Sequence, residues 1–207
     1  MAQMRGVMHL LLLSGFLGSG KTTFLLQVSR QVIEAGKRVA VVVNEIGEIG
    51  VDDRFLRHLG LGVWELPSGC ICCTLAGDLV STLRMLDAEH KPDLVIVEPS
   101  GAADPRNLLP LLPKYGGRPL ESIKTASVVD PLRIEALLAV LEPLVTSQIR
   151  HADVILVSKC DVASPEERDA ACRAANELNP GSPVFSLSAR DPLTPDLTTE
   201  LLPWLTP

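Results

Sequence analysis

Glycines and one lysine near the start of the chain have the spacing of a loop that binds phosphate groups. The segment from Gly15 to Thr22, GFLGSGKT, matches the pattern G-x-x-x-x-G-K-[ST] at every position. Glycines allow successive backbone N–H groups to turn toward phosphate oxygens, and a helix starting near Thr22 adds the positive end of its dipole. The residues expected to bind the nucleotide here are Gly15, Gly18, Ser19, Gly20, Lys21, Thr22 and Thr23.

Two of these residues are also expected to act in hydrolysis of a bound nucleoside triphosphate. Lys21 supplies a positive charge to the β- and γ-phosphates, and the Thr22 hydroxyl is a ligand for Mg²⁺. Lys21 and Thr22 would thus neutralise the charge that builds on the phosphates as the bond to the γ-phosphate breaks. The alternative is an accidental glycine-rich turn, but a strand before the motif and a helix after it favour a nucleotide site.

Glu98 and Gly101 follow another apolar run and point to the same chemistry. Glu98 ends the strand predicted over residues 93–98, where a carboxylate could bind Mg²⁺ or its waters and so assist catalysis. Gly101 has no side chain to block a close approach to the γ-phosphate. An exposed glutamate in a turn is the alternative.

A later tetrapeptide predicts which base is bound. Ser158-Lys159-Cys160-Asp161 resembles the guanine-reading pattern N-K-x-D, in which the Asp161 carboxylate accepts bonds from guanine N1–H and the 2-amino group. Lys159 can lie along the base, whereas Ser158 replaces the usual asparagine and should shorten or lose one supporting contact. Ser188 and Ala189 follow the last predicted strand, at the position of a loop that contacts the guanine base through its main-chain N–H groups. GTP is therefore the expected nucleotide, with ATP or a surface Lys-Asp turn as alternatives.

Three cysteines within four positions predict a metal site. Cys70, Cys72 and Cys73 can converge on one soft cation such as Zn²⁺, Co²⁺ or Cu⁺. Cys160 and Cys172 lie far along the chain, so the local site offers at most three strong ligands and suits transfer of a metal better than scaffolding. The alternative is a trio of small side chains packed in a turn.

Composition excludes several classes of protein. The chain has 207 residues, 46% of them hydrophobic, and a formal net charge of −6. These values exclude wholesale disorder and argue against a nucleic-acid partner. The apolar stretch Val7–Leu13 is too short to span a membrane, so no membrane association is expected. Five unevenly spaced cysteines indicate a reducing compartment, and hence a cytoplasmic location.

Strand-length apolar runs alternate with helical patterns along most of the chain. This alternation predicts an α/β fold of the P-loop NTPase type, a mostly parallel sheet with helices on both faces and ligands at the carboxyl ends of the strands. We expect a P-loop GTPase domain over residues 1–190 and a C-terminal tail over 191–207. The predicted strands are 7–14, 38–44, 63–66, 93–98, 122–130, 153–158 and 183–188, and the predicted helices are 22–35, 74–88, 133–149 and 164–178.

Five segments together resemble one family, the CobW-like GTPases, which are relatives of the UreG and HypB metallocentre-assembly GTPases. The segments are GFLGSGKTT, NEIGEIGVDD (residues 44–53), SGCICC, EPSG and SKCD, in the family's order. The resemblance implies that Cys70, Cys72 and Cys73 bind metal, that residues 44–53 form a switch, and that Glu45 or Glu48 approaches Mg²⁺ or the metal. Asp130 also matches a family position. Many members carry a further C-terminal domain, and this chain is expected to be a short form lacking it.

These observations together predict a slow GTPase that delivers or inserts a transition metal. GTP and GDP, Mg²⁺ and Zn²⁺ (or Co²⁺) are its expected ligands. A client metalloprotein or cofactor-dependent enzyme, and a homodimer that forms with nucleotide, are its expected partners. One alternative is a GTPase that activates or reactivates a metallocofactor enzyme, such as a corrinoid protein, without carrying metal. Another is a regulatory binder that uses GTP only to set its shape. No glutamine or histidine obviously positions the attacking water, so intrinsic turnover should be low.

Overall fold

The computed structural model describes residues 6–43, 62–65, 74–99, 101 and 107–205. Its strands agree with the predicted ones to within two residues at each end. They are β1 (Met8–Ser14), β2 (Val39–Val43), β3 (Gly62–Glu65), β4 (Leu94–Glu98), β5 (Leu120–Val129), β6 (Val154–Val157) and β7 (Val184–Ser186).

The helices also follow the predicted ranges, with two additions. Short helices also form between β4 and β5 and near the C-terminus. The helices are α1 (Lys21–Glu34), α3 (Thr74–Glu89), the 3-10 helix η3 (Leu109–Lys114), α4 (Ile134–Arg150), α5 (Pro165–Leu178) and α6 (Pro195–Leu201). Ser164 caps α5 in a capping box with Glu167, and Pro165 occupies its first turn, as the sequence indicates. No helix among the described residues has the length and apolar character needed to cross a membrane.

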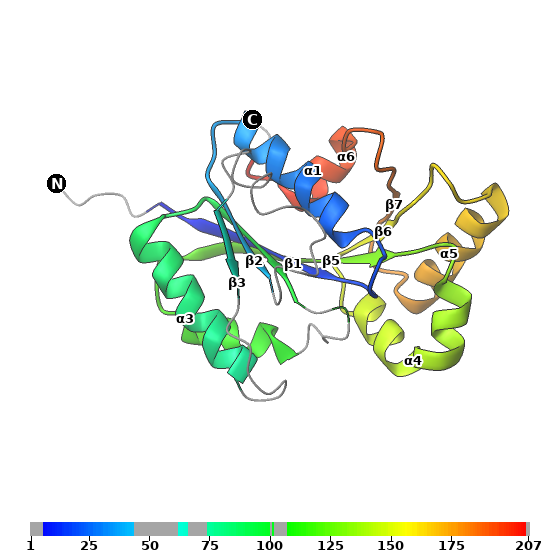
Figure 1. Ribbon diagram of the computed structural model, residues 1–207, viewed down its shortest axis with the longest axis horizontal. Coiled ribbons are helices and arrows are strands. Elements are labelled where there is room, and N and C mark those ends of the chain that lie inside the picture. The colour runs from blue at the N-terminus through cyan, green and yellow to red at the C-terminus, as the bar shows by residue number, and fades with distance from the viewer. Residues whose placement is uncertain (1–5, 44–61, 66–73, 100, 102–106, 206–207) are drawn as a thin grey trace.

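The described strands form one seven-stranded sheet in the order β3-β2-β4-β1-β5-β6-β7 (Figure 1). Every pairing is parallel, so the prediction of a mostly parallel sheet is confirmed. β1 lies at the centre, where Leu11 is in register with Ile96 on β4 and with Lys124 on β5. The carboxyl ends of β1, β4, β5 and β6 therefore meet at one edge, which is where ligands bind in such sheets.

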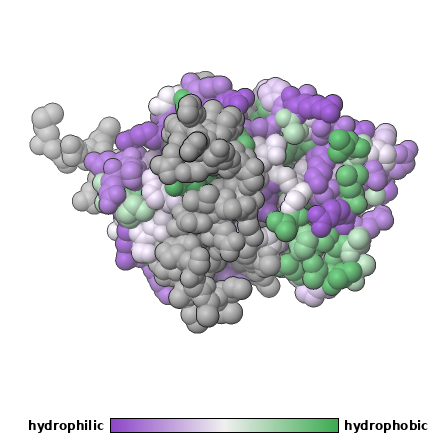
Figure 2. All heavy atoms as spheres, in the orientation of Figure 1, coloured by the Kyte–Doolittle hydropathy of each residue, from purple (hydrophilic) through white to green (hydrophobic). Residues whose placement is uncertain are grey.

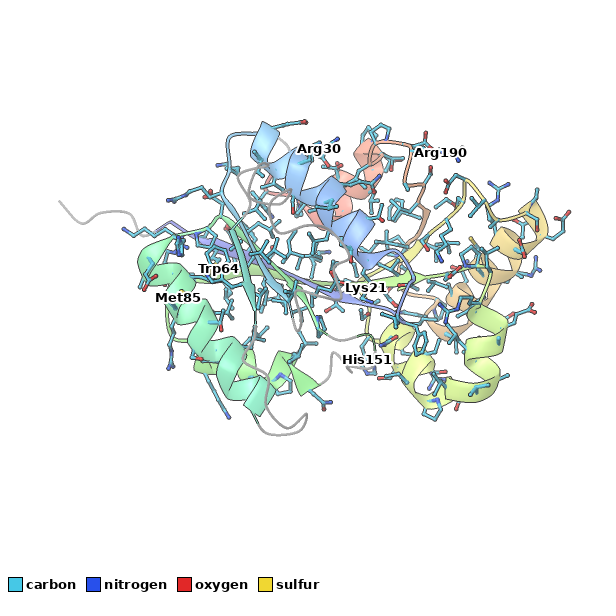
Figure 3. All side chains as sticks on the ribbon, in the orientation of Figure 1. Lys21, Arg30, Trp64, Met85, His151 and Arg190 are labelled. Atoms are coloured by element: carbon cyan, nitrogen blue, oxygen red, sulfur yellow. The ribbon has the colours of Figure 1, made fainter. Side chains whose placement is uncertain are left out.

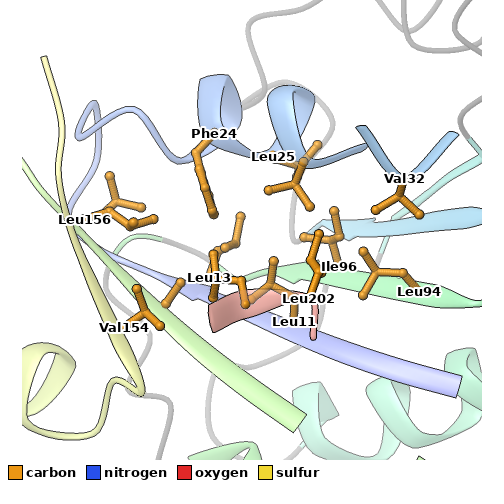
Figure 4. Packing of buried hydrophobic residues seen from close by; sticks show 14 of the residues in the cluster. Leu11, Leu13, Phe24, Leu25, Val32, Leu94, Ile96, Val154, Leu156 and Leu202 are labelled. Atoms are coloured by element: carbon orange, nitrogen blue, oxygen red, sulfur yellow. The ribbon is translucent and has the colours of Figure 1, made fainter. Parts of the chain in front are cut away.

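Both faces of the sheet are covered, which explains why its strands are continuous apolar runs. Leu11 and Leu13 of β1 pack with α1 and α6 on one face, as the close view of this cluster shows (Figure 4). Leu10 and Leu12 face the other side and pack with α3 and η3. α4 and α5 extend that second layer over β6. Packing on both faces therefore fixes the orientation of each strand and the position of its carboxyl end, where the ligand site is expected.

Helix α4 departs from regular geometry in its middle. Pro143 lies inside the helix, and Leu141 has non-helical angles (φ −126, ψ 32), which divide α4 at a kink. The segment before the kink is largely apolar yet partly open to solvent, with Val140 78% exposed. Figure 2 shows hydrophobic side chains gathered over this helix.

The C-terminal segment packs on the sheet through α6 and one tryptophan. Leu197, Leu201 and Leu202 are buried in the α1-side core. The Trp204 ring stacks on His9 of β1 with centroids 4.2 Å apart and planes 5° from parallel. These contacts make residues 195–204 a part of the layer that covers β1.

The stability of the fold should depend on the protonation of His9. Burial lowers the pKa of His9 below its usual 6.5, and the nearby carboxylates of Glu121 and Asp93 raise it by less. A histidine with a lowered pKa in the folded state contributes its full stability above pH 6.5, and this contribution is lost as the pH falls and His9 is protonated. We expect His9→Gln to reduce the difference in unfolding free energy between about pH 7.5 and about pH 5.5, measured by urea unfolding. An equal fall in stability in both proteins would contradict this origin of the acid sensitivity.

Candidate functional site

The loop between β1 and α1 is held open by its own lysine and by glycines. Gly15, Gly18 and Gly20 all have positive φ. A Cβ at Gly15 would lie 2.3 Å from the Val128 carbonyl oxygen of β5, so only glycine fits there. Lys21 is 6% exposed, and its Nζ donates to the carbonyl oxygens of Gly15 (3.0 Å) and Phe16 (3.4 Å). Figure 3 shows Lys21 at the start of α1, beside the end of β1.

The backbone of this loop fits a phosphate group. Within the described residues, the N–H groups of Gly18 and Gly20 have no backbone acceptor. The buried hydroxyl of Ser19 also has no hydrogen-bond partner there. Unpaired donors at the N-terminus of a 14-residue helix are the arrangement that binds anions. The geometry thus agrees with the predicted phosphate site.

Glu98, at the end of β4, faces the start of α1. The Thr22 hydroxyl donates to Glu98 at 3.4 Å, and Lys21 Nζ lies 3.9 Å from the same carboxylate oxygen. The Glu98 side chain is 13% exposed. One hydroxyl and one carboxylate beside a phosphate site fit Mg²⁺, which usually takes one or two protein ligands together with phosphate oxygens and water.

Gly101 lies against the outer turn of the phosphate loop. A Cβ at Gly101 would be 2.7 Å from the Leu17 nitrogen. Gln148, a buried residue of α4, donates from Nε2 to the Gly101 carbonyl at 3.1 Å. A side chain at Gly101 would therefore displace the loop, and the approach of Gly101 to the γ-phosphate stays a prediction.

The predicted guanine loop is joined to the phosphate loop. The Ser158 hydroxyl donates to the carbonyl oxygen of Ser19 (2.6 Å) and lies 3.1 Å from that of Val129. Lys159 has a left-handed backbone (φ 54), and its Nζ pairs with Asp130 at 2.7 Å. The Asp130 side chain is only 2% exposed, so this pair anchors the segment from Ser158 to Asp161 beside β5.

The side chain of Asp161 lies next to the second predicted base loop. Its carboxylate is 3.4 Å from Arg190 Nε, and the Arg190 side chain is 77% exposed. The Asp161 side chain is 17% exposed, whereas Arg190 is largely in solvent and can move away to leave the carboxylate to a ligand. Ser188 accepts a bond from Gln27 Nε2 through its carbonyl (3.0 Å), which ties this loop to α1.

A cavity of about 600 Å³ opens between α1 and residues 189–193. Thr23 and Ala189, both predicted to contact the nucleotide, line its two walls. Arg30 and Arg190, labelled in Figure 3, lie on the same two walls.

Sequence reasoning missed three residues that shape the site: Gln27, Arg133 and Gln148. Arg133 follows β5 by four positions, and the convergence of strand ends at one edge could have identified it. Gln27 lies one helical turn after Thr23, so the i, i+4 spacing could have placed it on the same face of α1. Nothing in the local pattern of α4 distinguishes Gln148.

The predicted metal site lies outside the described residues. This applies to Cys70, Cys72 and Cys73, to Glu45 and Glu48, and to the switch over residues 44–53. Among the described residues, no group of three or more His, Cys, Asp or Glu side chains could hold a metal ion. Cys160 and Cys172 are free thiols, and burial raises the pKa of Cys172, which disfavours the thiolate that binds metal.

The sheet and the loop that follows β1 define a nucleotide-binding α/β domain of the P-loop class. Residues 9–186 match the family described as "CobW/HypB/UreG, nucleotide-binding domain", and the chain belongs to this family. The resemblance found from the sequence motifs is thereby confirmed.

The zinc chaperone YeiR of Escherichia coli is 33% identical over 175 residues, which cover 78% of this chain and 49% of YeiR. The zinc chaperone CobW of a Sinorhizobium species is 32% identical, with 72% of this chain and 50% of CobW covered. The chain thus spans about half the length of these curated relatives. The crystal structure of the Zn(II)-bound YjiA GTPase from E. coli superimposes with a TM-score of 0.63 at 25% identity, covering 95% of this chain and 63% of YjiA.

The tight approach of Gly101 to the phosphate loop gives a test of the site. We expect Gly101→Ala to weaken binding of GTP and GDP at least about tenfold, since the new Cβ would displace Leu17 and disturb the row of N–H donors. Isothermal titration calorimetry measures this loss. Gly181→Ala is the matched control, since its Cβ would meet only the Asn179 side chain at 3.9 Å. Equal affinity in the Gly101 and Gly181 variants would contradict the role of this approach.

Proposed function

We propose that this protein binds and hydrolyses GTP and couples the hydrolysis to delivery of a transition metal, as a metallochaperone. The observation that carries the proposal is the convergence of Lys21, Thr22 and Glu98 at the mouth of the phosphate loop. Membership of the CobW/HypB/UreG family, and relatives that are named zinc chaperones, support the same function.

The geometry supports a simple role for each residue in nucleotide binding. Lys21 holds the loop through two carbonyl oxygens and can exchange them for phosphate oxygens, which are stronger, charged acceptors. Thr22 and Glu98 would hold Mg²⁺, which supplies charge neutralisation to the phosphates when it is bound. Gly18 and Gly20 offer N–H donors whose orientation is fixed before the ligand arrives, and such preorganisation is how charge in a transition state is stabilised.

The position of Asp161 supports guanine as the base. We expect wild-type protein to prefer GTP to ATP, and Asp161→Asn to remove most of that preference, because the amide can no longer accept two bonds from guanine. A charge-assisted hydrogen bond contributes roughly 1.5–3 kcal/mol, which corresponds to at least about a tenfold change in the affinity ratio. Competition between GTP, ITP and ATP for a fluorescent guanine nucleotide measures this ratio. Asp169→Asn, an exposed substitution on α5, is the control. An unchanged ratio in Asp161→Asn would rule out guanine reading by this loop.

The metal is the cargo in this proposal, and the cysteine trio is its predicted site. Combined replacement of Cys70, Cys72 and Cys73 by serine should weaken Zn²⁺ binding at least about a hundredfold, because serine hydroxyls are poor ligands for a soft cation. Competition with a chromophoric chelator under anaerobic conditions measures the affinity. The matched control replaces Cys160 and Cys172 by serine and should bind Zn²⁺ as the wild type does. If the triple variant binds Zn²⁺ as tightly as the wild type, the metal site is wrong, and activation of a metalloenzyme without metal transfer becomes the better account.

The rate of GTP hydrolysis is proposed to depend on a partner. Intrinsic GTP turnover is low, and a client metalloprotein or a nucleotide-dependent homodimer raises it by completing the site. Lys21 is required for turnover, since without its charge the triphosphate is left insufficiently neutralised.

A further inference from the structure

Arg133 lies on the outer side of the phosphate loop, although it comes from the segment between β5 and α4. Its Nη1 donates to the Leu17 carbonyl oxygen at 2.9 Å. Its guanidinium carbon is 5.5 Å from the centre of the Phe16 ring, within the range of a cation–π contact. A Cβ at Gly18 would be 3.4 Å from the same nitrogen. Arg133 therefore touches two consecutive residues, Phe16 and Leu17, and lies beside Gly18 in the loop that the proposed function assigns to phosphate binding.

The stability of α4 does not explain the charge at this position. Arg133 is the N-cap residue of α4 and makes no capping bond with its side chain. The N-terminus of a helix carries a partial positive charge, so a cation there is unfavourable for the helix. Among the described residues, no carboxylate pairs with Arg133. Its side-chain hydrogen bond among the described residues is the one to the Leu17 carbonyl of the phosphate loop.

The bond to Leu17 has a consequence for Gly18. The described peptide bonds are all trans, and in a trans peptide the C=O and the N–H point in opposite directions. When Arg133 holds the Leu17 oxygen outward, the N–H of the same peptide unit, which belongs to Gly18, points toward the interior of the loop. That N–H has no backbone acceptor among the described residues. Gly18 itself has φ 74, a conformation that a glycine readily leaves, so the orientation of this peptide needs an external contact.

We propose that Arg133 is a positioning residue for the phosphate chain of the nucleotide. It fixes the Leu17–Gly18 peptide with the Gly18 N–H directed at a phosphate oxygen. Its charge also polarises that peptide, which makes the N–H a stronger donor, as neighbouring hydrogen bonds do in a chain. This inference rests on the proposed binding of GTP and adds a residue to it that the motif does not contain.

The test compares nucleotide affinity with the stability of the protein without nucleotide. We expect Arg133→Ala to raise the Kd for both GDP and a non-hydrolysable GTP analogue about tenfold, because one charge-assisted contact in the cradle is lost. Arg133→Lys keeps a charged donor and should recover part of the loss, and Arg133→Gln should recover less. Binding of guanosine, which has no phosphate, should be the same in all variants. The thermal unfolding midpoint without nucleotide should be unchanged or slightly higher in Arg133→Ala, since an unfavourable charge leaves the start of α4.

The control is Arg150→Ala, which removes the same charge from an exposed side chain at the end of the same helix. It should leave the affinity for GDP and for the GTP analogue unchanged. The inference is overturned if Arg133→Ala binds these nucleotides as tightly as the wild type, if it loses guanosine binding equally, or if its unfolding midpoint falls together with affinity. The proposed function fails separately, and takes the inference with it, if the wild-type protein does not bind GTP.

Discussion

The constraint on which the site depends is that a row of backbone N–H groups must stay open while the chain around it is fully packed. Unpaired polar groups of this kind cost free energy, and a glycine-rich loop would relieve that cost by collapsing onto itself. Neighbouring elements prevent the collapse. The Val128 carbonyl lies against Gly15, Ser158 binds the Ser19 carbonyl, and Gly101 lies against Leu17. Each contact comes from the end of a different strand.

These contacts originate at the carboxyl ends of three parallel strands. Glu98 ends β4, Val128 and Asp130 lie at the end of β5, and Ser158 follows β6. Parallel pairing through β1 brings these ends to one edge, although their residues are separated by up to 60 positions in the chain. The two covered faces fix the strands in register, so the loop is held by the core of the domain and not by its own sequence alone.

Much of this arrangement could be predicted from the sequence, because it is encoded locally. The apolar runs that become β1, β2, β4 and β6 are too continuous for strands with a solvated face, and the phosphate motif stands between a strand and a helix. What could not be predicted depends on contacts between distant segments. The bond from Ser158 to Ser19 spans 139 positions and the bond from Arg133 to Leu17 spans 116. Nothing in the tetrapeptide itself indicates that the Ser158 side chain would bind the Ser19 carbonyl. The kink at Leu141 also escaped prediction, since α4 reads as one helical pattern.

In the proposed function, two sites share one equilibrium, because the bound nucleotide would set how firmly Cys70, Cys72 and Cys73 hold a metal. If this is so, linkage requires that the metal changes nucleotide affinity by the same factor. The most direct measurement is the Kd for Zn²⁺ in the presence of saturating GDP and then of a saturating non-hydrolysable GTP analogue, with the reciprocal measurement of nucleotide affinity with and without Zn²⁺. The account predicts that the two Zn²⁺ affinities differ by at least about fivefold, and that the reciprocal ratio agrees. Equal Zn²⁺ affinity in the two nucleotide states would contradict it.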